Sequence, residues 1–136
     1  LVPGNHGLDA LALDILRKKV GQYRSKMNSF NSKLAKIEKE VLKAKNDVVS
    51  AEKTVKITMK QYKLKKRIES AKKELFDKKV GSMLSYLQAQ DATLAASRAN
   101  LGASDTVDAK KSALSAKLSD KGTLQADLDE FVAKWS

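Results

Sequence analysis

The sequence predicts an all-α fold, a long antiparallel two-helix coiled-coil hairpin, with a kink or an extra helix near the N-terminus as an open alternative. Three observations carry this prediction. Apolar residues in the first half recur at alternating steps of three and four, the spacing of a coiled-coil seam. The 136 residues, enough for one domain, contain a single Pro and only 5% aromatic residues, whereas 32% are charged. A Gly-Ser pair then separates a Lys-rich half from an Ala-rich half.

The first expected element is an ascending helix over residues 8–79. Residues 1–7 precede it and are expected to be a leading linker or a cloning scar, because they contain the Pro and two Gly residues. The seam of this helix runs through Leu13, Leu16, Val20, Tyr23, Met27, Phe30, Leu34, Ile37, Val41, Ala44, Val48, Ala51, Val55, Thr58 and Tyr62. It then shifts to Leu64, Ile68, Ala71 and Leu75, which we interpret as a stutter within one continuous helix. Residues 28–32 are rich in cap formers, so a break there is an open alternative.

The hairpin tip is expected at residues 80–82. Lys78 and Lys79 suit the negative end of a helix dipole. Gly81 is expected to take the left-handed conformation past the helix end, and Ser82 is expected to cap the next helix.

A return helix is expected over residues 83–135, with kinks at 102–105 and 122 as alternatives because glycines weaken a helix there. In a hairpin, the numbers of facing residues would add up to about 161–163, which places Leu75 near Leu87 and Ile68 near Leu94. The same register places Trp135 near Met27, so the N-terminal part of the ascending helix extends past the return helix.

The residue types that catalysis and metal binding usually need are scarce. The chain has no Cys, and its one histidine is His6. This argues against disulfides, thiolate zinc sites, Cys nucleophiles and His-based catalysis. The acidic cluster of Asp127, Asp129 and Glu130 is expected to be a solvated helix face. The sequence therefore predicts no enzyme, no cofactor and no metal site.

The positive charge is concentrated in the first half. Residues 1–80 carry 21 Lys and Arg against 9 Asp and Glu, and nine of these cations lie between Lys53 and Lys73, with Glu69 as the only acid among them. A solvated helix face is the favoured interpretation, and binding to nucleic acid or an anionic membrane is the alternative. No aromatic residues alternate with the cations as a stacking platform, so no specific nucleic acid partner is expected.

The segment from Lys73 to Leu101, KELFDKKVGSMLSYLQAQDATLAASRANL, resembles the α-helical hairpin of bacterial membrane fusion proteins. These are the periplasmic adaptors of type I secretion and tripartite efflux, and the likeness is to the haemolysin-secretion adaptor type. The family's tip pattern is a basic residue, a Leu four positions later and a Ser seven positions further. Leu75 and Ser82 match it, whereas the basic position is Ala71 here.

The resemblance implies a function at the tip. Leu75, Val80, Gly81 and Ser82 would contact an outer-membrane channel protein, with Lys72, Lys73, Lys78 and Lys79 in place of the missing basic residue. The parent protein would be anchored in the inner membrane, project into the periplasm, serve an ABC or other transporter and form a homo-oligomeric ring. Two alternatives stay open: a basic coiled coil that binds nucleic acid or an anionic surface, and a stalk-type coiled coil of an export ATPase.

Overall fold

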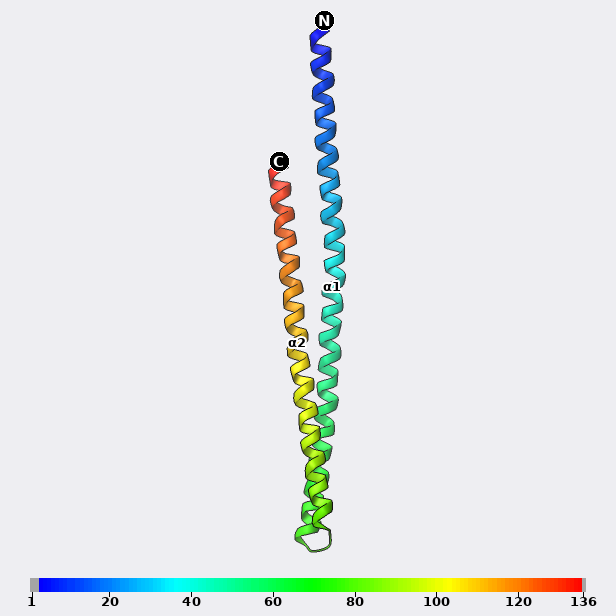
Figure 1. Cartoon of the computed structure of the whole chain (residues 1–136), viewed down its shortest axis with the longest axis vertical. Helices are drawn as coiled ribbons and strands as arrows, with labels where there is room; N and C mark the ends of the chain where they lie inside the picture. Colours follow the sequence, from blue (N-terminus) through cyan, green and yellow to red (C-terminus); the bar gives the residue numbers. More distant parts are fainter. Residues whose placement is uncertain (1–2, 136) are drawn as a thin grey trace. The chain divides into compact units, whose positions relative to one another are not determined.

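The computed structural model describes residues 3–135, with side chains from residue 7 onward. Two helices account for nearly all of this range: α1 spans Pro3–Asp77 and α2 spans Met83–Trp135, joined by a loop of residues 78–82 (Figure 1). They run antiparallel and pack against each other, and the described residues contain no strand. The predicted all-α helical hairpin is confirmed.

The element bounds differ from the predicted ones in a few places. Helix α1 includes residues 3–7, which the sequence predicted as a linker, because Pro3 fits the first turn of a helix, where its missing N–H leaves no hydrogen bond unmade. Residues 1 and 2 lie outside the described residues. Helix α1 passes through 28–32 without a break, and α2 is continuous through 102–105 and Gly122. Helix α1 ends at Asp77, two residues before the predicted end.

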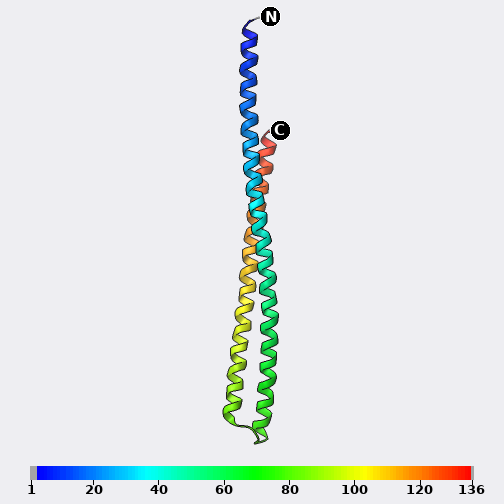
Figure 2. The ribbon, with the colours of Figure 1, turned by 90° about the vertical axis from the view of Figure 1, so that its right-hand side faces the viewer.

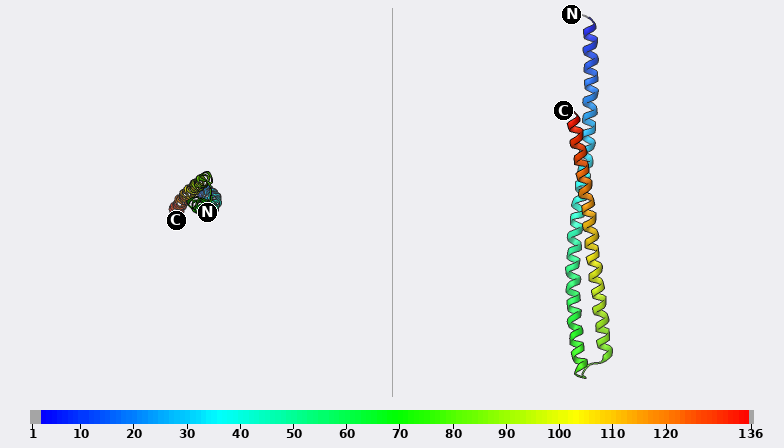
Figure 3. Two further views of the ribbon diagram at one scale, coloured as in Figure 1. Left: turned by 90° about the horizontal axis from the view of Figure 1, so that it is seen from below. Right: turned by 90° about the vertical axis from the view of Figure 1, so that its left-hand side faces the viewer.

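The chain forms two compact units, one of residues 3–40 with 118–135 and one of residues 41–117. In the first, the end of α2 lies beside α1, and the beginning of α1 extends past it (Figure 3). An aromatic cluster joins the helices: the Tyr23 ring lies 5.5 Å from that of Phe131 and 5.1 Å from that of Trp135, and the Phe30 ring lies 5.6 Å from that of Phe131. Trp135 therefore contacts Tyr23, about one helical turn before the predicted neighbour Met27. Beyond this cluster, the apolar residues from Leu8 to Val20 are exposed.

The second unit contains the tip (Figure 2) and the most buried of the described residues. Its core consists of small side chains from both helices: Val41, Val48, Ala51, Ala89 and Val107. Small residues allow helices to approach closely, which suits a narrow two-helix seam. The predicted seam of α1 is followed up to Tyr62, which is partly buried.

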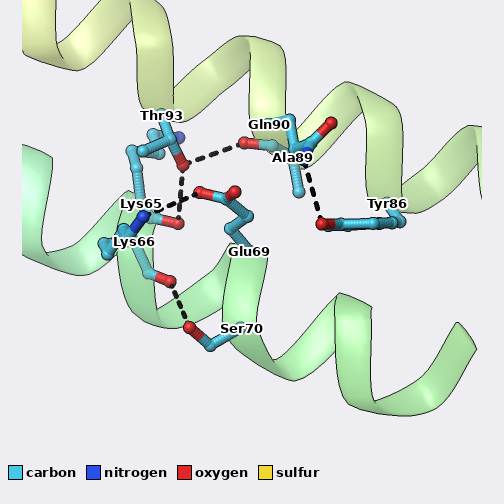
Figure 4. A network of polar contacts seen from close by, with 8 residues as sticks. All are labelled: Lys65, Lys66, Glu69, Ser70, Tyr86, Ala89, Gln90 and Thr93. Carbon is cyan, nitrogen blue, oxygen red and sulfur yellow. Dashed lines mark hydrogen bonds and ion pairs between the residues drawn. The ribbon is translucent and has the colours of Figure 1, made fainter. Parts of the chain in front are cut away.

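Past Tyr62 the predicted stutter is wrong. The side of α1 that faces α2 keeps its three-four spacing through the Lys65 carbonyl and the partly buried Glu69, Lys72 and Phe76, whereas Leu64, Ile68 and Leu75 are exposed. A hydrogen bond joins the helices here: the Thr93 hydroxyl lies 3.2 Å from the Lys65 carbonyl of α1 (Figure 4). The same hydroxyl lies 3.0 Å from the Ala89 carbonyl within α2. Nearer the middle of the unit, the Thr58 hydroxyl lies 2.9 Å from the Asn100 side-chain oxygen.

These polar contacts set a register different from the predicted one. Thr58 faces Asn100 and Lys65 faces Thr93, so the numbers of facing residues add up to 158 in both pairs. This is about one helical turn from the predicted register. In this register Leu75 and Ile68 do not face Leu87 and Leu94 as predicted, and all four side chains are exposed.

No helix among the described residues is sufficiently long and apolar to cross a membrane.

Candidate functional site

Helix α1 ends in a Schellman motif that fixes the shape of the tip. The Lys79 N–H donates to the Phe76 carbonyl at 2.9 Å, and the Val80 N–H donates to the Leu75 carbonyl at 2.9 Å. The Gly81 N–H also donates to the Leu75 carbonyl, at 3.0 Å. These bonds satisfy carbonyls that the end of the helix would otherwise leave unpaired. The loop is therefore folded back onto the last turn of α1.

Lys79, and not Gly81, takes the left-handed conformation. Lys79 has φ 62°, the only positive φ among the described residues, and the prediction for Gly81 is wrong in this respect. The Schellman hydrogen bonds explain the difference, because they place the left-handed position two residues after Asp77. A non-glycine residue in this region costs roughly 1 kcal/mol or more.

Gly81 is required for a different reason, the close approach of the loop to α1. A Cβ atom built on Gly81 would lie 3.0 Å from the Leu75 Cβ and 3.4 Å from the Leu75 carbonyl carbon and the Phe76 nitrogen. Only a residue without a side chain fits against this turn of the helix without moving it. Leu75 and Gly81, both predicted as tip residues, are thus in direct contact.

Ser82 begins the return helix as predicted. Its side-chain Oγ accepts a hydrogen bond from the Ser85 N–H at 3.0 Å, and its carbonyl accepts the first helical bond from the Tyr86 N–H at 3.3 Å. This is the geometry of an N-cap. One of the predicted basic residues supports the same turn, because Lys72 Nζ donates to Ser85 Oγ at 2.8 Å across the helices.

A second contact across the helices lies just below the tip. The rings of Phe76 and Tyr86 are stacked with their centroids 6.1 Å apart. The sequence analysis did not single out either residue for the tip. The signal was present, however, since Phe76 continues the three-four spacing from Tyr62 through positions 65, 69 and 72.

The remaining predicted tip residues differ in what they offer to a partner. Lys73, Lys78 and Lys79 are all exposed, and Lys78 forms an ion pair with Glu74 at 2.9 Å. Val80 is 76% exposed in the middle of the loop. Two exposed apolar residues that the sequence analysis placed only in the return helix, Met83 and Leu84, lie directly after the cap. The tip therefore presents apolar side chains beside cations on a rigid turn.

The basic run is spread over α1 and does not form a single strip. Lys53, Lys60 and Arg67 are seven residues apart and share one line along the helix, whereas Lys65, Lys66 and Lys72 lie on other sides, so the cations cover roughly three quarters of the circumference. Lys65 lies at the seam, where its carbonyl accepts a hydrogen bond from Thr93. This distribution is typical of a solvated helix and provides no groove for nucleic acid.

Among residues 3–135, no group of three or more His, Cys, Asp or Glu side chains is arranged to hold a metal ion. The predicted solvated cluster near the end of α2 is exposed in the structure, and there Glu130 pairs with Lys134 at 3.1 Å. The arrangement at the tip is suited to recognition, since it combines a fixed backbone with exposed side chains.

Comparisons of the chain with models of protein families, with curated proteins and with solved structures found no match.

Proposed function

We propose that the chain is the adaptor hairpin of a periplasmic membrane fusion protein. Through its tip, it would join an inner-membrane transporter to an outer-membrane channel protein in secretion or efflux. The parent protein would be anchored in the inner membrane and would act as a ring of copies. The proposal combines the resemblance of residues 73–101 to this family with the form of the tip.

The single observation that carries the proposal is the exposed apolar end of a rigid turn. Val80 is 76% exposed and Leu84 is 65% exposed, although the backbone between them is fixed by the Schellman bonds and the Ser82 cap. Exposed apolar side chains of this kind are typical of contact sites for other proteins. A rigid tip also loses little conformational entropy on binding, which favours affinity.

The charges beside these residues suit an electrostatically selective contact. Lys79 is exposed in the loop, and Lys73 is exposed on α1 about one turn before the helix ends at Asp77. We therefore assign the basic part of the docking contact to Lys73 and Lys79, because Lys72 is bonded to Ser85 across the helices and Lys78 is paired with Glu74.

Ser82→Asp in the full-length parent tests the proposal. Asp is as good an N-cap as Ser, so the return helix keeps its stability, but the docking surface gains a negative charge. We expect the variant protein to reach wild-type levels and to lose at least tenfold in export or efflux. Lys45→Asp is the matched control, because Lys45 is exposed on α1 far from the tip in sequence, and it is expected to retain transport.

Normal transport by a stably expressed Ser82→Asp parent would remove Ser82 from the docking contact. Equal losses in the Ser82→Asp and Lys45→Asp variants would instead indicate a general effect of charge, and would contradict a role specific to the tip.

A further inference from the structure

In the half of the hairpin nearest the tip, large apolar residues are exposed on α1 while a carboxylate lies at the seam. Leu64 is 55% exposed and Ile68 is 40% exposed, whereas the side chain of Glu69 at the seam is only 16% exposed. One Glu69 oxygen has no hydrogen-bond partner, and its nearest cation is Lys66 Nζ at 3.9 Å (Figure 4). Large exposed apolar residues beside buried polar ones are informative, because folding alone favours the reverse.

The exposed apolar residues of α1 form one continuous stripe. Ile57, Leu64, Ile68 and Leu75 are spaced by seven, four and seven residues, so they lie on one side of the helix within about 60° of each other. This stripe is adjacent to the seam with α2, and its spacing is that of a second coiled-coil seam. It therefore has the pattern required to pack against a further helix.

A groove borders this stripe between the two helices. It has a volume of about 540 Å³ and is lined by Gln61, Leu64 and Lys65 of α1 and by Ala92, Ala95 and Ala96 of α2. The three alanines leave room for the backbone of an incoming helix, as small residues do at close helix contacts. One wall is thus formed by Leu64 with two long polar side chains, and the other by small side chains.

A row of cations lines the outer edge of the stripe. Lys53, Lys60 and Arg67 are seven residues apart, and none of them has an ion pair within the part of the chain that the structure describes. Lys65 adds a further positive charge at the floor of the groove. The one nearby carboxylate on this edge of α1, Glu74, is paired with Lys78.

We propose that this groove binds a single amphipathic helix of a partner protein, with apolar residues at seam spacing and Asp or Glu along the edge that faces Lys53, Lys60 and Arg67. The charge pattern decides between this occupant and a second copy of the chain. Residues 41–117 carry 17 Lys and Arg against 8 Asp and Glu, so two copies would repel each other along the groove, whereas an acidic helix would be attracted. The site is separate from the tip and does not depend on the proposed function.

Two synthetic peptides of about 21 residues, or three heptads, test the proposal. Both have Leu at the seam positions, and the flanking positions are Glu in one and Lys in the other. Fluorescence anisotropy of the labelled peptides with the whole chain is expected to show at least tenfold tighter binding of the Glu peptide. The affinity of that peptide should fall severalfold when the salt concentration is raised.

Variants of the chain test whether the peptide binds in the groove. Leu64→Ser combined with Ile68→Ser should weaken the Glu peptide at least tenfold, and Arg67→Glu should weaken it severalfold. Leu94→Ser is the matched control, since Leu94 is 49% exposed but lies on the opposite flank of α2 from Ala92. All of these side chains are exposed, so the helical content by circular dichroism should not change.

Equal affinity for the two peptides, or an equal loss in the Leu94→Ser variant, would overturn the proposal. Sedimentation that shows self-association of the chain, abolished by Leu64→Ser with Ile68→Ser, would assign the groove to a second copy and would also overturn it.

Discussion

Gly81→Ala is expected to destabilise the hairpin, although most glycines in this chain would gain from the same change. The added Cβ would lie 3.0 Å from the Leu75 Cβ and 3.4 Å from two backbone atoms of α1. A contact at 3.0 Å has to be relieved by moving the backbone, since the Leu75 Cβ cannot rotate away. Overpacking of this kind costs about 1–3 kcal/mol.

Whether Gly81→Ala raises or lowers the free energy of unfolding shows if the glycine is needed for its close contact with Leu75. At a glycine with ordinary φ and open space, Ala stabilises a protein by about 0.4–1 kcal/mol, because it restricts the unfolded chain. Gly81 has no positive φ, so only the close contact with Leu75 argues for destabilisation. Gly102 is the control within the same unit: it lies inside α2 with nothing within 4 Å of its added Cβ, and Gly102→Ala should stabilise by about 1 kcal/mol.

Urea unfolding followed by circular dichroism at 222 nm measures both variants. A Gly81→Ala hairpin that is as stable as wild type, or more stable, would refute the reasoning, provided that Gly102→Ala shows its expected gain. Lys79→Gly completes the set, because relief of the left-handed conformation at φ 62° should stabilise the tip by about 0.5–1 kcal/mol. A loss of stability in Lys79→Gly would indicate that the lysine side chain itself holds the turn.

Three further predictions concern the cap, the seam and the basic surface. Ser82→Ala should lower the free energy of unfolding by about 1 kcal/mol and Ser82→Asp should leave it unchanged, since only the alanine removes the bond to the Ser85 N–H; equal losses in the two would contradict the cap. Glu69→Leu should raise thermal stability, because it removes a mostly buried carboxylate with an unsatisfied oxygen, and a lower melting temperature would show that the Lys66 pair outweighs this cost. Binding to DNA should be weak, indifferent to sequence and lost on raising the salt concentration, and a sub-micromolar complex in moderate salt would instead support the nucleic acid alternative.

Sequence periodicity predicted the seam of α1 correctly from Tyr23 to Tyr62, because apolar or small residues occupy its seam positions in this stretch. Past Tyr62 the seam positions 65, 69 and 72 are polar, and the nearest apolar residues are Leu64 and Ile68. A prediction from apolar spacing alone therefore assigns Leu64 and Ile68 to the seam. The helix pairing instead follows hydrogen bonds, from Thr93 to the Lys65 carbonyl and from Lys72 to Ser85. Such bonds depend on which residues of α2 face α1, and this register cannot be obtained from the pattern of one helix.

The tip was predicted in its position and its cap, but not in its backbone. Ser82 follows the common preference for Ser at an N-cap. The preference for Gly in the left-handed position suggested Gly81, whereas the end of α1 at Asp77 places that conformation at Lys79. Val80 was predicted as a tip residue, whereas the exposure of Leu84 was not predicted, because its position in the return helix suggested a seam residue.

Site-specific photo-crosslinking from residue 80 tests the central claim, contact of the tip with a channel protein, most directly. A photoreactive amino acid replaces Val80 in the full-length parent, and a second version replaces Lys45, which is exposed on α1. We predict that the residue 80 probe forms a covalent adduct with an outer-membrane protein and that the residue 45 probe forms none with that protein. Equal adducts from both positions, or adducts from residue 80 only with soluble or cytoplasmic components, would contradict the proposed docking of the tip.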